Sequence, residues 1–382
     1  MILSPLKVRI VAAPNEYFGV IMSEPDRSVE STEPSGHKRR VRYSGSHPIS
    51  FEHKYKEHKI DQHPELLDHL RQKGKTPAGM HIPIMLTEVM EHLVPKPGDI
   101  VADCTVGYGG HAAEFLKRIG AGGRLIAFDV DGGELERTKQ RLSGYEAAKS
   151  FYRSNFAGIA NVMGKEGIDG YDVIFADIGV SSMQIDNPAR GLSYKYPGPL
   201  DMRMDDRLKQ TGADMLATLS AEQIAKALRD FADEPDSDLI ADRIAGQREE
   251  QPITQTQQLV EVIFEAKGID RKEWKNQQRN SKTPMLNPAA RTFQALRILV
   301  NDELGVLKEL LRVAPYCLRT GGRIGIISFH SGEDRIVKHS FRDGLDDGTY
   351  TRIAEHAITP TPEELAANPR SASAKFRWAM KG

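Results

Sequence analysis

Short apolar strands that alternate with helices constrain the fold of this chain more than any other feature. Residues 99–103 (DIVAD), 124–129 (RLIAFD) and 171–177 (YDVIFAD) each predict a buried strand that ends in an aspartate. Between the first two, apolar residues recur at helical spacing over 112–119. Strands that alternate with helices are typical of a parallel sheet covered on both faces, so the sequence predicts a doubly wound, Rossmann-like α/β domain.

The alternation is interrupted once and then resumes. Strand patterns disappear between about 189 and 288, a single long helix is predicted from 287 to 311, and residues 323–328 (RIGIIS) form the next predicted strand. We therefore predict three segments after an N-terminal extension: a first part of the sheet domain over 80–188, an inserted helical substrate-recognition domain over 189–288, and a second part of the sheet domain over 289–382.

Residues 1–79 differ from the rest in charge and in apolar patterning. They carry 13 basic and 10 acidic groups, whereas the whole chain has 52 and 53 and a net charge of −1. Few apolar residues recur at regular spacing before His63, so we predict a basic, His-rich extension of low order. His53, His58 and His63 recur every five residues, which is poor spacing for ligands on a helix, and we predict no metal site.

The cysteine count and the hydropathy bear on the compartment. Two cysteines, Cys104 and Cys317, cannot build a disulfide framework or a Cys-based zinc site. No apolar run reaches the roughly 18–20 residues of a membrane span, and charged residues and prolines interrupt the N-terminus where a signal peptide needs a continuous apolar region. The sequence predicts a cytoplasmic protein with no membrane partner and does not fix its oligomeric state.

The first candidate site is the glycine turn that follows the strand at 99–103. Its sequence, Asp103-Cys-Thr-Val-Gly107-Tyr-Gly109-Gly110-His111, lets the backbone approach a ligand, and Asp129 ends the next strand where a carboxylate can accept hydrogen bonds from ribose hydroxyls. The dinucleotide pattern G-x-G-x-x-G and the P-loop are both absent. Together with the acidic Asp103, this pattern favours S-adenosylmethionine, whose amino-acid tail needs partners of both charges.

Three further segments are candidates for chemistry. Residues 177–184 leave a strand at its carboxyl end, the loop 191–205 is rich in aromatic, Gly-Pro and Arg residues, and residues 328–335 follow another strand. The alternatives are a capped turn for the first segment and rigid packing for the loop. A Ser/His/Asp triad in 328–335 is rejected, because its members are contiguous and no G-x-S-x-G elbow is present.

These four segments, with 287–304 and 368–377, resemble the bacterial ribosomal small-subunit methyltransferase H family. The resemblance runs from His81 to nearly the end of the chain, and the strings GPLDMRMD and RTFQALRI…VNDEL make it specific. It implies a class I methyltransferase fold with an inserted helical domain. It also implies methylation of N4 of one cytidine in the decoding region of 16S rRNA, with S-adenosylmethionine as cofactor and 16S rRNA or the small ribosomal subunit as partner.

The resemblance also assigns roles to residues. The implied cofactor contacts are Gly109, Gly110, His111, Asp129, Phe156, Asp177 and Gln184. We expect substrate contacts from Arg203, Arg291, His330, Lys375 and Arg377. Asp177 is hypothesised to lie near both the cofactor and the target amino group and so to be catalytic. Tyr194, Tyr196 or Phe329 is expected to stack on the cytosine, and the basic segment 271–282 with Trp274 is either a further RNA contact or a solvated loop.

Two departures and two rival functions complete the sequence picture. Gly332 stands where the family usually has leucine, and residues 233–239 lack the usual pattern, so no role is carried over to them. The rivals are a non-catalytic ribosome-assembly or RNA-binding factor and a methyltransferase that acts on DNA or protein. The family pattern is not expected to cover residues 1–79, which we predict to be dispensable, at least in part, or to reflect an upstream start assignment.

Overall fold

The computed structural model describes residues 83–281, 283 and 285–382. The predicted extension over 1–79, including its three regularly spaced histidines, lies outside the described residues. Cys104 and Cys317 are both buried and unpaired. No helix of the described chain is long and apolar enough to cross a membrane.

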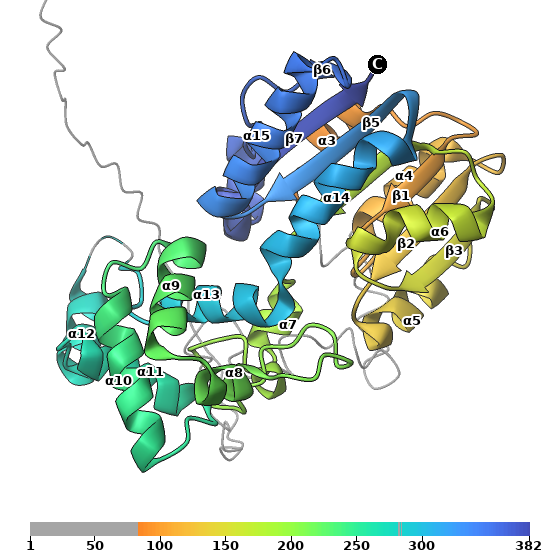
Figure 1. Ribbon diagram of the computed structural model, residues 1–382. Helices are drawn as coiled ribbons and strands as arrows, with labels where there is room; N and C mark the ends of the chain where they lie inside the picture. Colours follow the sequence, from red (N-terminus) through yellow and green to blue (C-terminus); the bar gives the residue numbers. More distant parts are fainter. Residues whose placement is uncertain (1–82, 282, 284) are drawn as a thin grey trace, which may run out of the picture. The chain divides into compact units, whose positions relative to one another are not determined.

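One sheet organises the described residues (Figure 1). Its strands are β1 (Ile100–Asp103), β2 (Arg124–Asp129), β3 (Ala148–Arg153), β4 (Tyr171–Asp177), β5 (Leu318–Ser328), β6 (Tyr350–Ile353) and β7 (Lys375–Lys381). The strand order is β3-β2-β1-β4-β5-β7-β6, with β7 antiparallel to both of its neighbours and the other pairs parallel. The predicted α/β fold with a doubly wound sheet is confirmed.

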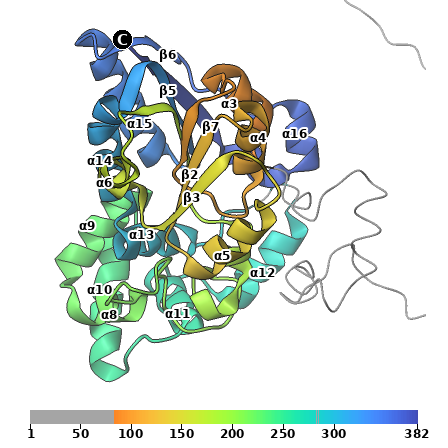
Figure 2. The same ribbon diagram turned by 90° about the vertical axis from the view of Figure 1, so that its right-hand side faces the viewer.

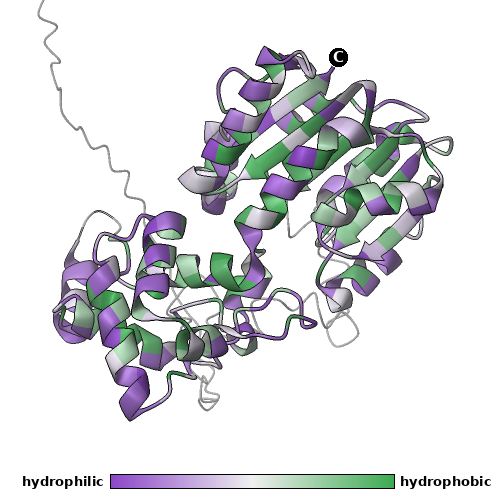
Figure 3. Cartoon of the chain, viewed as in Figure 1, coloured by the Kyte–Doolittle hydropathy of each residue, from purple (hydrophilic) through white to green (hydrophobic). Residues whose placement is uncertain are grey.

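Helices cover both faces of this sheet, as Figure 2 shows with α6, α14 and α15 on one side and α3 and α4 on the other. The helices of this domain are α3 (Leu86–Leu93), α4 (Gly110–Ile119), α5 (Gly132–Arg141), α6 (Ile159–Glu166), α14 (Glu303–Cys317), α15 (Ser331–Asp346) and α16 (Pro362–Ala367), with short 3-10 turns η3 (Phe156–Gly158) and η5 (Pro369–Ser373). The strands are predominantly hydrophobic and the helices mixed (Figure 3), as expected for strands buried on both faces.

The strand register brings the predicted acidic residues to one edge. Asp103 pairs with Ala127 of β2 and with Phe175 of β4, so the ends of β2, β1 and β4 lie side by side. Asp177 pairs with Ile327 near the end of β5. Ligands of open α/β sheets bind at the carboxyl ends of the strands, and the candidate residues therefore share the expected edge.

The insertion is helical and has an apolar core of its own. Its elements are α7 (Ser182–Asp186), η4 (Pro188–Arg190), α8 (Gly212–Thr218), α9 (Ala221–Ala232), α10 (Ser237–Glu250), α11 (Thr256–Ala266), α12 (Arg271–Asn280) and α13 (Ala290–Asn301). Buried Ile224, Leu228 and Ile244 pack with Leu259 and Ile263 in this core. The buried side of α13, including Phe293 and Leu296, belongs to the same cluster, so the insertion's packing continues past residue 288.

The prediction of a single long helix over 287–311 is wrong. Asp302 has a φ of 49° and separates α13 from α14. The apolar spacing runs through the break, which is why the sequence pattern did not show it. A two-pronged ion pair joins the two helices, since Arg297 Nε and Nη2 donate to the carboxylate of Glu303 at 2.8 and 3.0 Å.

Candidate cofactor and substrate site

The glycine turn between β1 and α4 is fixed by its own backbone and by α5. Gly107 and Gly109 have φ values of +45° and +88°, a region that side chains with a Cβ rarely adopt. A Cβ added to Gly109 would lie 2.9 Å from Thr138 Cγ2, so α5 packs directly against the turn. Val106 N donates to Phe128 O at 2.9 Å, and Thr138 Oγ1 donates to Gly107 O. The turn is therefore shaped before any ligand arrives.

Asp129 connects the glycine turn with the end of β2. Its Oδ2 accepts from Gly107 N and its Oδ1 from Asp131 N, both at 2.9 Å. Burial is the main cause that raises the pKa of Asp129 to about 6, and these two hydrogen bonds oppose that rise. Each carboxylate oxygen can accept a second hydrogen bond. Asp129 can thus accept from two ribose hydroxyls without giving up its internal partners.

Two further aspartates lie at the same edge of the sheet, Asp103 at the end of β1 and Asp177 at the end of β4. The pKa of each is raised to about 7, mainly by burial; the charge of Asp129 contributes to the rise for Asp103, and the charges of Asp103 and Glu333 contribute to the rise for Asp177. Asp103 Oδ1 accepts from Thr105 N at 3.1 Å, and Asp177 N donates to Thr105 Oγ1 at 2.7 Å, so Thr105 ties the two strand ends together. Asp177 Oδ1 is buried and has no hydrogen-bond partner.

Three aspartates end consecutive strands in the order Asp129, Asp103 and Asp177, and Glu333 follows them from the first turn of α15, after β5; we call these four carboxylates the acidic row. Within the described residues, none of the three aspartates forms an ion pair. Uncompensated negative charge at this edge favours a cationic ligand. The sulfonium and ammonium groups of S-adenosylmethionine are such charges, and the unpartnered Asp177 Oδ1 is an acceptor left for a ligand. The residues present fit this cofactor.

The other predicted cofactor residues have different surroundings. Gly110 begins α4, and the His111 ring is buried, with Nε2 3.0 Å from Ile84 O and the ring centroid 4.5 Å from that of Phe175. Burial lowers the pKa of His111 to about 4, so the ring is neutral and anchors α4, leaving its backbone for the ligand. Phe156 begins η3, which two residues separate from the end of β3. Gln184 caps α7, its side chain accepting a hydrogen bond from Ser181 N at 3.0 Å.

Of the predicted substrate residues, Arg203, Lys375 and Arg377 have acidic partners within the chain. Arg203 donates to both carboxylate oxygens of Asp201, at 2.7 and 2.8 Å. Arg377 is 7 % exposed and donates to Asp334 Oδ1 at 2.6 Å, and Lys375 lies 3.2 Å from the same carboxylate. These ion pairs with Asp201 and Asp334 reduce the positive charge and the number of free hydrogen-bond donors that the three side chains present to an RNA.

Arg291 and His330 are brought together, although 39 positions separate them in the sequence. Both line a cavity of about 230 Å³ at the start of α15. The basic segment 271–282 contains α12, in which Trp274 is buried edge-on against Phe264 at 5.7 Å between ring centroids. The Trp274 ring packs in the core of the insertion and is therefore not available to stack on a base.

The aromatic residues expected to stack on the cytosine differ in position. Tyr194 packs edge-on against Phe293 of α13, at 5.9 Å between centroids. Phe329, at the end of β5, lies beside Gly179, where an added Cβ would be 3.4 Å from its ring. Gly179 follows Asp177 by two residues. Of the three candidates Tyr194, Tyr196 and Phe329, Phe329 is therefore the one that, within the described residues, has a contact beside the acidic row.

The sequence reasoning did not single out the contacts that join the insertion to the cofactor turn. Arg190 is ion-paired with Asp131, the N-cap of α5, and Arg153 at the end of β3 is ion-paired with Asp206. The loop that carries GPLDMRMD thus borders the end of β3 and, through Arg190, the turn between β2 and α5. Charge pairing between residues 59 and 53 positions apart leaves no local sequence signal.

An α/β sheet of this order, with a glycine turn and an acid-lined edge, defines a class I methyltransferase. The chain belongs to the MraW methylase family, whose model matches residues 78–382. The resemblance stated from the sequence is confirmed, and S-adenosylmethionine is the cofactor.

Curated relatives carry the methyltransferase H name. One from Alkaliphilus metalliredigens, "Ribosomal RNA small subunit methyltransferase H 2", is 43 % identical over 90 % of this chain and 97 % of its own length. Another, from Lachnoclostridium phytofermentans, "Ribosomal RNA small subunit methyltransferase H 1", is 40 % identical over 96 % of this chain and 98 % of its own. Among solved structures, an rRNA methylase from Streptococcus thermophilus is 12 % identical, with a TM-score of 0.35, over 80 % of this chain and 97 % of that one.

These alignments also bear on the N-terminal extension. The family model begins at residue 78, in line with the expectation that the family pattern does not cover residues 1–79. The relative from Lachnoclostridium phytofermentans nevertheless aligns over 96 % of this chain, which includes part of the extension. The expectation is therefore wrong for that relative, in which part of the extension has a counterpart.

Proposed function

We propose that this chain transfers a methyl group from S-adenosylmethionine to the exocyclic N4 of a cytidine in the decoding region of 16S rRNA, in the cytoplasm. Membership of the methylase family and the names of the relatives support rRNA of the small subunit as the substrate. The observation that carries the proposal is Asp177, whose buried Oδ1 has no partner at the sheet edge where ligands bind.

An amino group on a cytosine ring is a poor nucleophile, because its lone pair is delocalised into the ring. An acceptor that binds one amino hydrogen localises the lone pair on nitrogen, and Asp177 Oδ1 is the buried acceptor with that capacity. Holding the two reacting groups in line contributes up to about 7–11 kcal/mol to such a displacement. S-adenosylmethionine supplies the methyl group from a sulfonium centre.

The proton balance also assigns a role to Asp177. When the new carbon–nitrogen bond forms and the carbon–sulfur bond breaks, N4 becomes positively charged and must lose a proton. A carboxylate with a pKa of about 7 can take that proton and release it to solvent near neutral pH. Phe329, which lies beside Gly179, is positioned to stack on the ring of the target base.

The proposal is tested by offering one methyl donor to four acceptors. Small subunits, naked 16S rRNA, DNA and total protein, all from cells that lack this enzyme, are incubated with S-adenosylmethionine labelled in its methyl group. We expect label in small subunits or 16S rRNA, recovered as N4-methylcytidine after nuclease digestion and mapped to one decoding-region position by mass spectrometry. Label in DNA or protein, methylation of a different RNA atom, or no transfer at all would contradict the proposal and favour one of the rival functions.

A further inference from the structure

Three cations line two neighbouring cavities beside α15, the helix whose first turn carries Glu333. We propose that Arg291, Lys308 and Arg335 form a phosphate-binding groove for the rRNA backbone beside the target nucleotide, an inference that rests on the proposed function. We call these three residues the cationic groove.

The groove begins in the cavity of about 230 Å³ at the start of α15. This cavity is lined by residues from the end of α9, from α13 and from the loop that leads into α15, among them Arg291, Gln294, His330 and Arg335. Helical insertion and sheet domain both contribute to it. A ligand in this cavity therefore contacts both parts of the enzyme.

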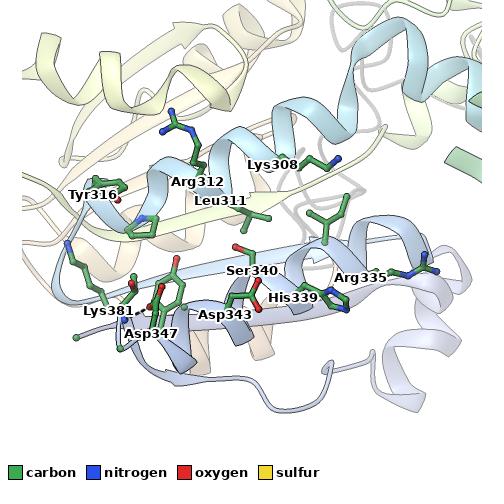
Figure 4. A pocket seen from close by; sticks show the side chains of 17 residues that line it. Lys308, Leu311, Arg312, Tyr316, Arg335, His339, Ser340, Asp343, Asp347 and Lys381 are labelled. Carbon is green, nitrogen blue, oxygen red and sulfur yellow. Dashed lines mark hydrogen bonds between the residues drawn. The ribbon is translucent and has the colours of Figure 1, made fainter. Parts of the chain in front are cut away.

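The groove continues into a larger depression between α14 and α15, with a volume of about 820 Å³. Arg335 lines both spaces, and Lys308 of α14 lines the larger one. Figure 4 shows Lys308, Arg335 and His339 at one end of this depression, with Asp347 and Lys381 toward the other. Toward the other end, the lining cations Arg312 and Lys381 are matched in number by Asp343 and Asp347. The net positive charge therefore lies at the end with Arg335, which also lines the smaller cavity.

The cations of the groove are not neutralised inside the protein. Asp230 and Asp233 also line the smaller cavity, but neither carboxylate is paired with a cation of the groove, and Asp230 is bound to Lys226 instead. In the described part of the chain, no carboxylate lies within 4.0 Å of the charged nitrogens of Arg291, Lys308 or Arg335, and Arg291 Nη1 donates only to the backbone oxygen of Asp233. Arg203 and Arg377 contrast with them, because each of these guanidinium groups is bound to an internal aspartate. Unpaired guanidinium groups bind phosphate oxygens through two parallel hydrogen bonds.

The groove also has the right place relative to Asp177. Glu333, in the first turn of α15, accepts a hydrogen bond from Phe329 N at 2.9 Å, and its charge acts on Asp177. The segment over 329–333, which leads into the first turn of α15, therefore borders the acidic row on one side and the cavity with His330 on the other. An RNA whose target base reaches Asp177 would bring its flanking phosphates to this loop, and a polyanion fits the unpaired cations there.

The test neutralises the three cations together, as Arg291→Gln, Lys308→Gln and Arg335→Gln in one protein. The control carries Lys338→Gln and Arg342→Gln, two exposed cations of α15, the helix of Arg335, that line neither cavity; it removes two charges where the test variant removes three. Binding of a labelled decoding-region RNA is measured between 50 and 300 mM salt, and the KM for small subunits is measured at saturating S-adenosylmethionine. Cofactor affinity, measured by calorimetry, shows that each variant is folded.

For the triple variant we expect a KM for small subunits raised at least tenfold, an unchanged cofactor affinity, and a salt dependence of log K reduced by about 2, from three phosphate contacts at about 0.7 each. The control should keep the wild-type values. A triple variant with the wild-type KM and salt slope would overturn the groove, as would a control that changes as much as the triple variant. If the wild-type protein binds the RNA but methylates none, the proposed function fails while the salt slopes still decide the groove.

Discussion

The two halves of the ligand-binding edge treat their polar groups in opposite ways. At the ends of β1 and β2, both oxygens of Asp129 accept backbone hydrogen bonds, and His111 is bound to Ile84 O. At the ends of β4 and β5, Asp177 Oδ1 has no partner, and Arg335 of the adjoining helix has no acidic partner among the described residues. The polar groups of the first half have hydrogen-bond partners without a ligand, and we call it the finished half. The second half has polar groups without partners, which a ligand can bind, and we call it the unfinished half.

This difference has an energetic meaning. A buried polar group without a partner costs about 1–3 kcal/mol, so it persists where a ligand offsets the cost. A fully bonded turn, in contrast, contributes to folding and presents a fixed shape to its ligand. We infer that the β1–β2 half is preorganised for the cofactor, and that the β4–β5 half gains its missing contacts only when cofactor and RNA are both bound.

The largest effect should come from the unfinished half. Asp177→Asn replaces the proton-accepting carboxylate with a neutral amide of the same shape. We expect methyl transfer to fall at least 100-fold, because the amino group loses its base. The thermal midpoint should stay equal or rise, since the change removes a carboxylate that burial and two neighbouring charges disfavour. Turnover with small subunits and thermal unfolding measure the two quantities.

Asp346→Asn, at an exposed position near the end of α15, is the control for Asp177→Asn and should leave both quantities unchanged. Full turnover in the Asp177→Asn protein would remove Asp177 from the mechanism. A marked loss of thermal stability in that protein would show instead that this half is as finished as the other.

In the finished half, loss of an aspartate should lower stability, because two backbone donors lose their acceptors and this outweighs the relief of a buried carboxylate. Asp129→Ala leaves Gly107 N and Asp131 N without acceptors and removes the partner for the ribose hydroxyls. We expect the Kd for S-adenosylmethionine to rise about 30-fold and the free energy of unfolding to fall by about 1–3 kcal/mol. Calorimetric titration and denaturant unfolding provide the measurements. If the Asp129→Ala protein is as stable as the wild type, the hydrogen bonds of Asp129 do not stabilise the fold, and the proposed difference between Asp129 and Asp177 is wrong.

The shape of the glycine turn can be tested separately from its charge. Gly109→Ala places a methyl group 2.9 Å from Thr138 Cγ2 and forces a side chain into a φ of +88°. We expect a loss of about 2 kcal/mol in unfolding free energy and a cofactor Kd raised about tenfold. Thr138→Ser removes the clashing methyl and keeps the hydroxyl that donates to Gly107 O, so the double variant should recover part of the stability. If the double variant is no more stable than Gly109→Ala alone, the whole loss comes from backbone strain at residue 109 and not from the contact with Thr138.

The sequence predicted the finished half better than the unfinished half, and the reason is physical. Strand, glycine turn and strand-end acid are local patterns, so Asp103, Gly107 and Asp129 could be placed from spacing alone. The edge strand β3 was missed because its residues are only partly buried and lack an apolar run. The strand β7 was missed because it is recognised by its antiparallel pairing with β5, which is distant in the sequence.

Long-range pairing also hid which cations are available. Arg291 and Arg377 both stand in strings typical of the family, yet Arg377 is buried against Asp334 of α15 while Arg291 lines a cavity. Asn301 holds the GPLDMRMD loop, with Oδ1 accepting from Met204 N at 2.7 Å and Nδ2 donating to Met202 O at 2.8 Å. A sequence shows residue types but not these partners, which lie 43 to 99 positions away.

The smallest expected effect is a pH dependence that joins the two halves. Burial raises the pKa of Asp103 and of Asp177 to about 7 and that of Asp129 to about 6. In the unfolded chain these groups titrate near 3.8, so the cofactor-free fold binds more protons and loses stability as pH rises from about 4 to 7. A cationic cofactor favours the charged carboxylates and lowers their pKa values, so its binding releases protons.

The Kd for S-adenosylmethionine should therefore fall as pH rises from 5.5 to 7.5, by about tenfold, and level off above the highest of these pKa values. Calorimetry in buffers of different ionisation enthalpy measures the protons released at each pH. In the Asp177→Asn protein, the number of protons released on cofactor binding should fall by the contribution of that one carboxylate. Asp346→Asn should leave the number of released protons unchanged. A Kd independent of pH in this range would mean that the acidic row is already charged without the cofactor, and that the two halves of the edge differ in hydrogen bonding alone.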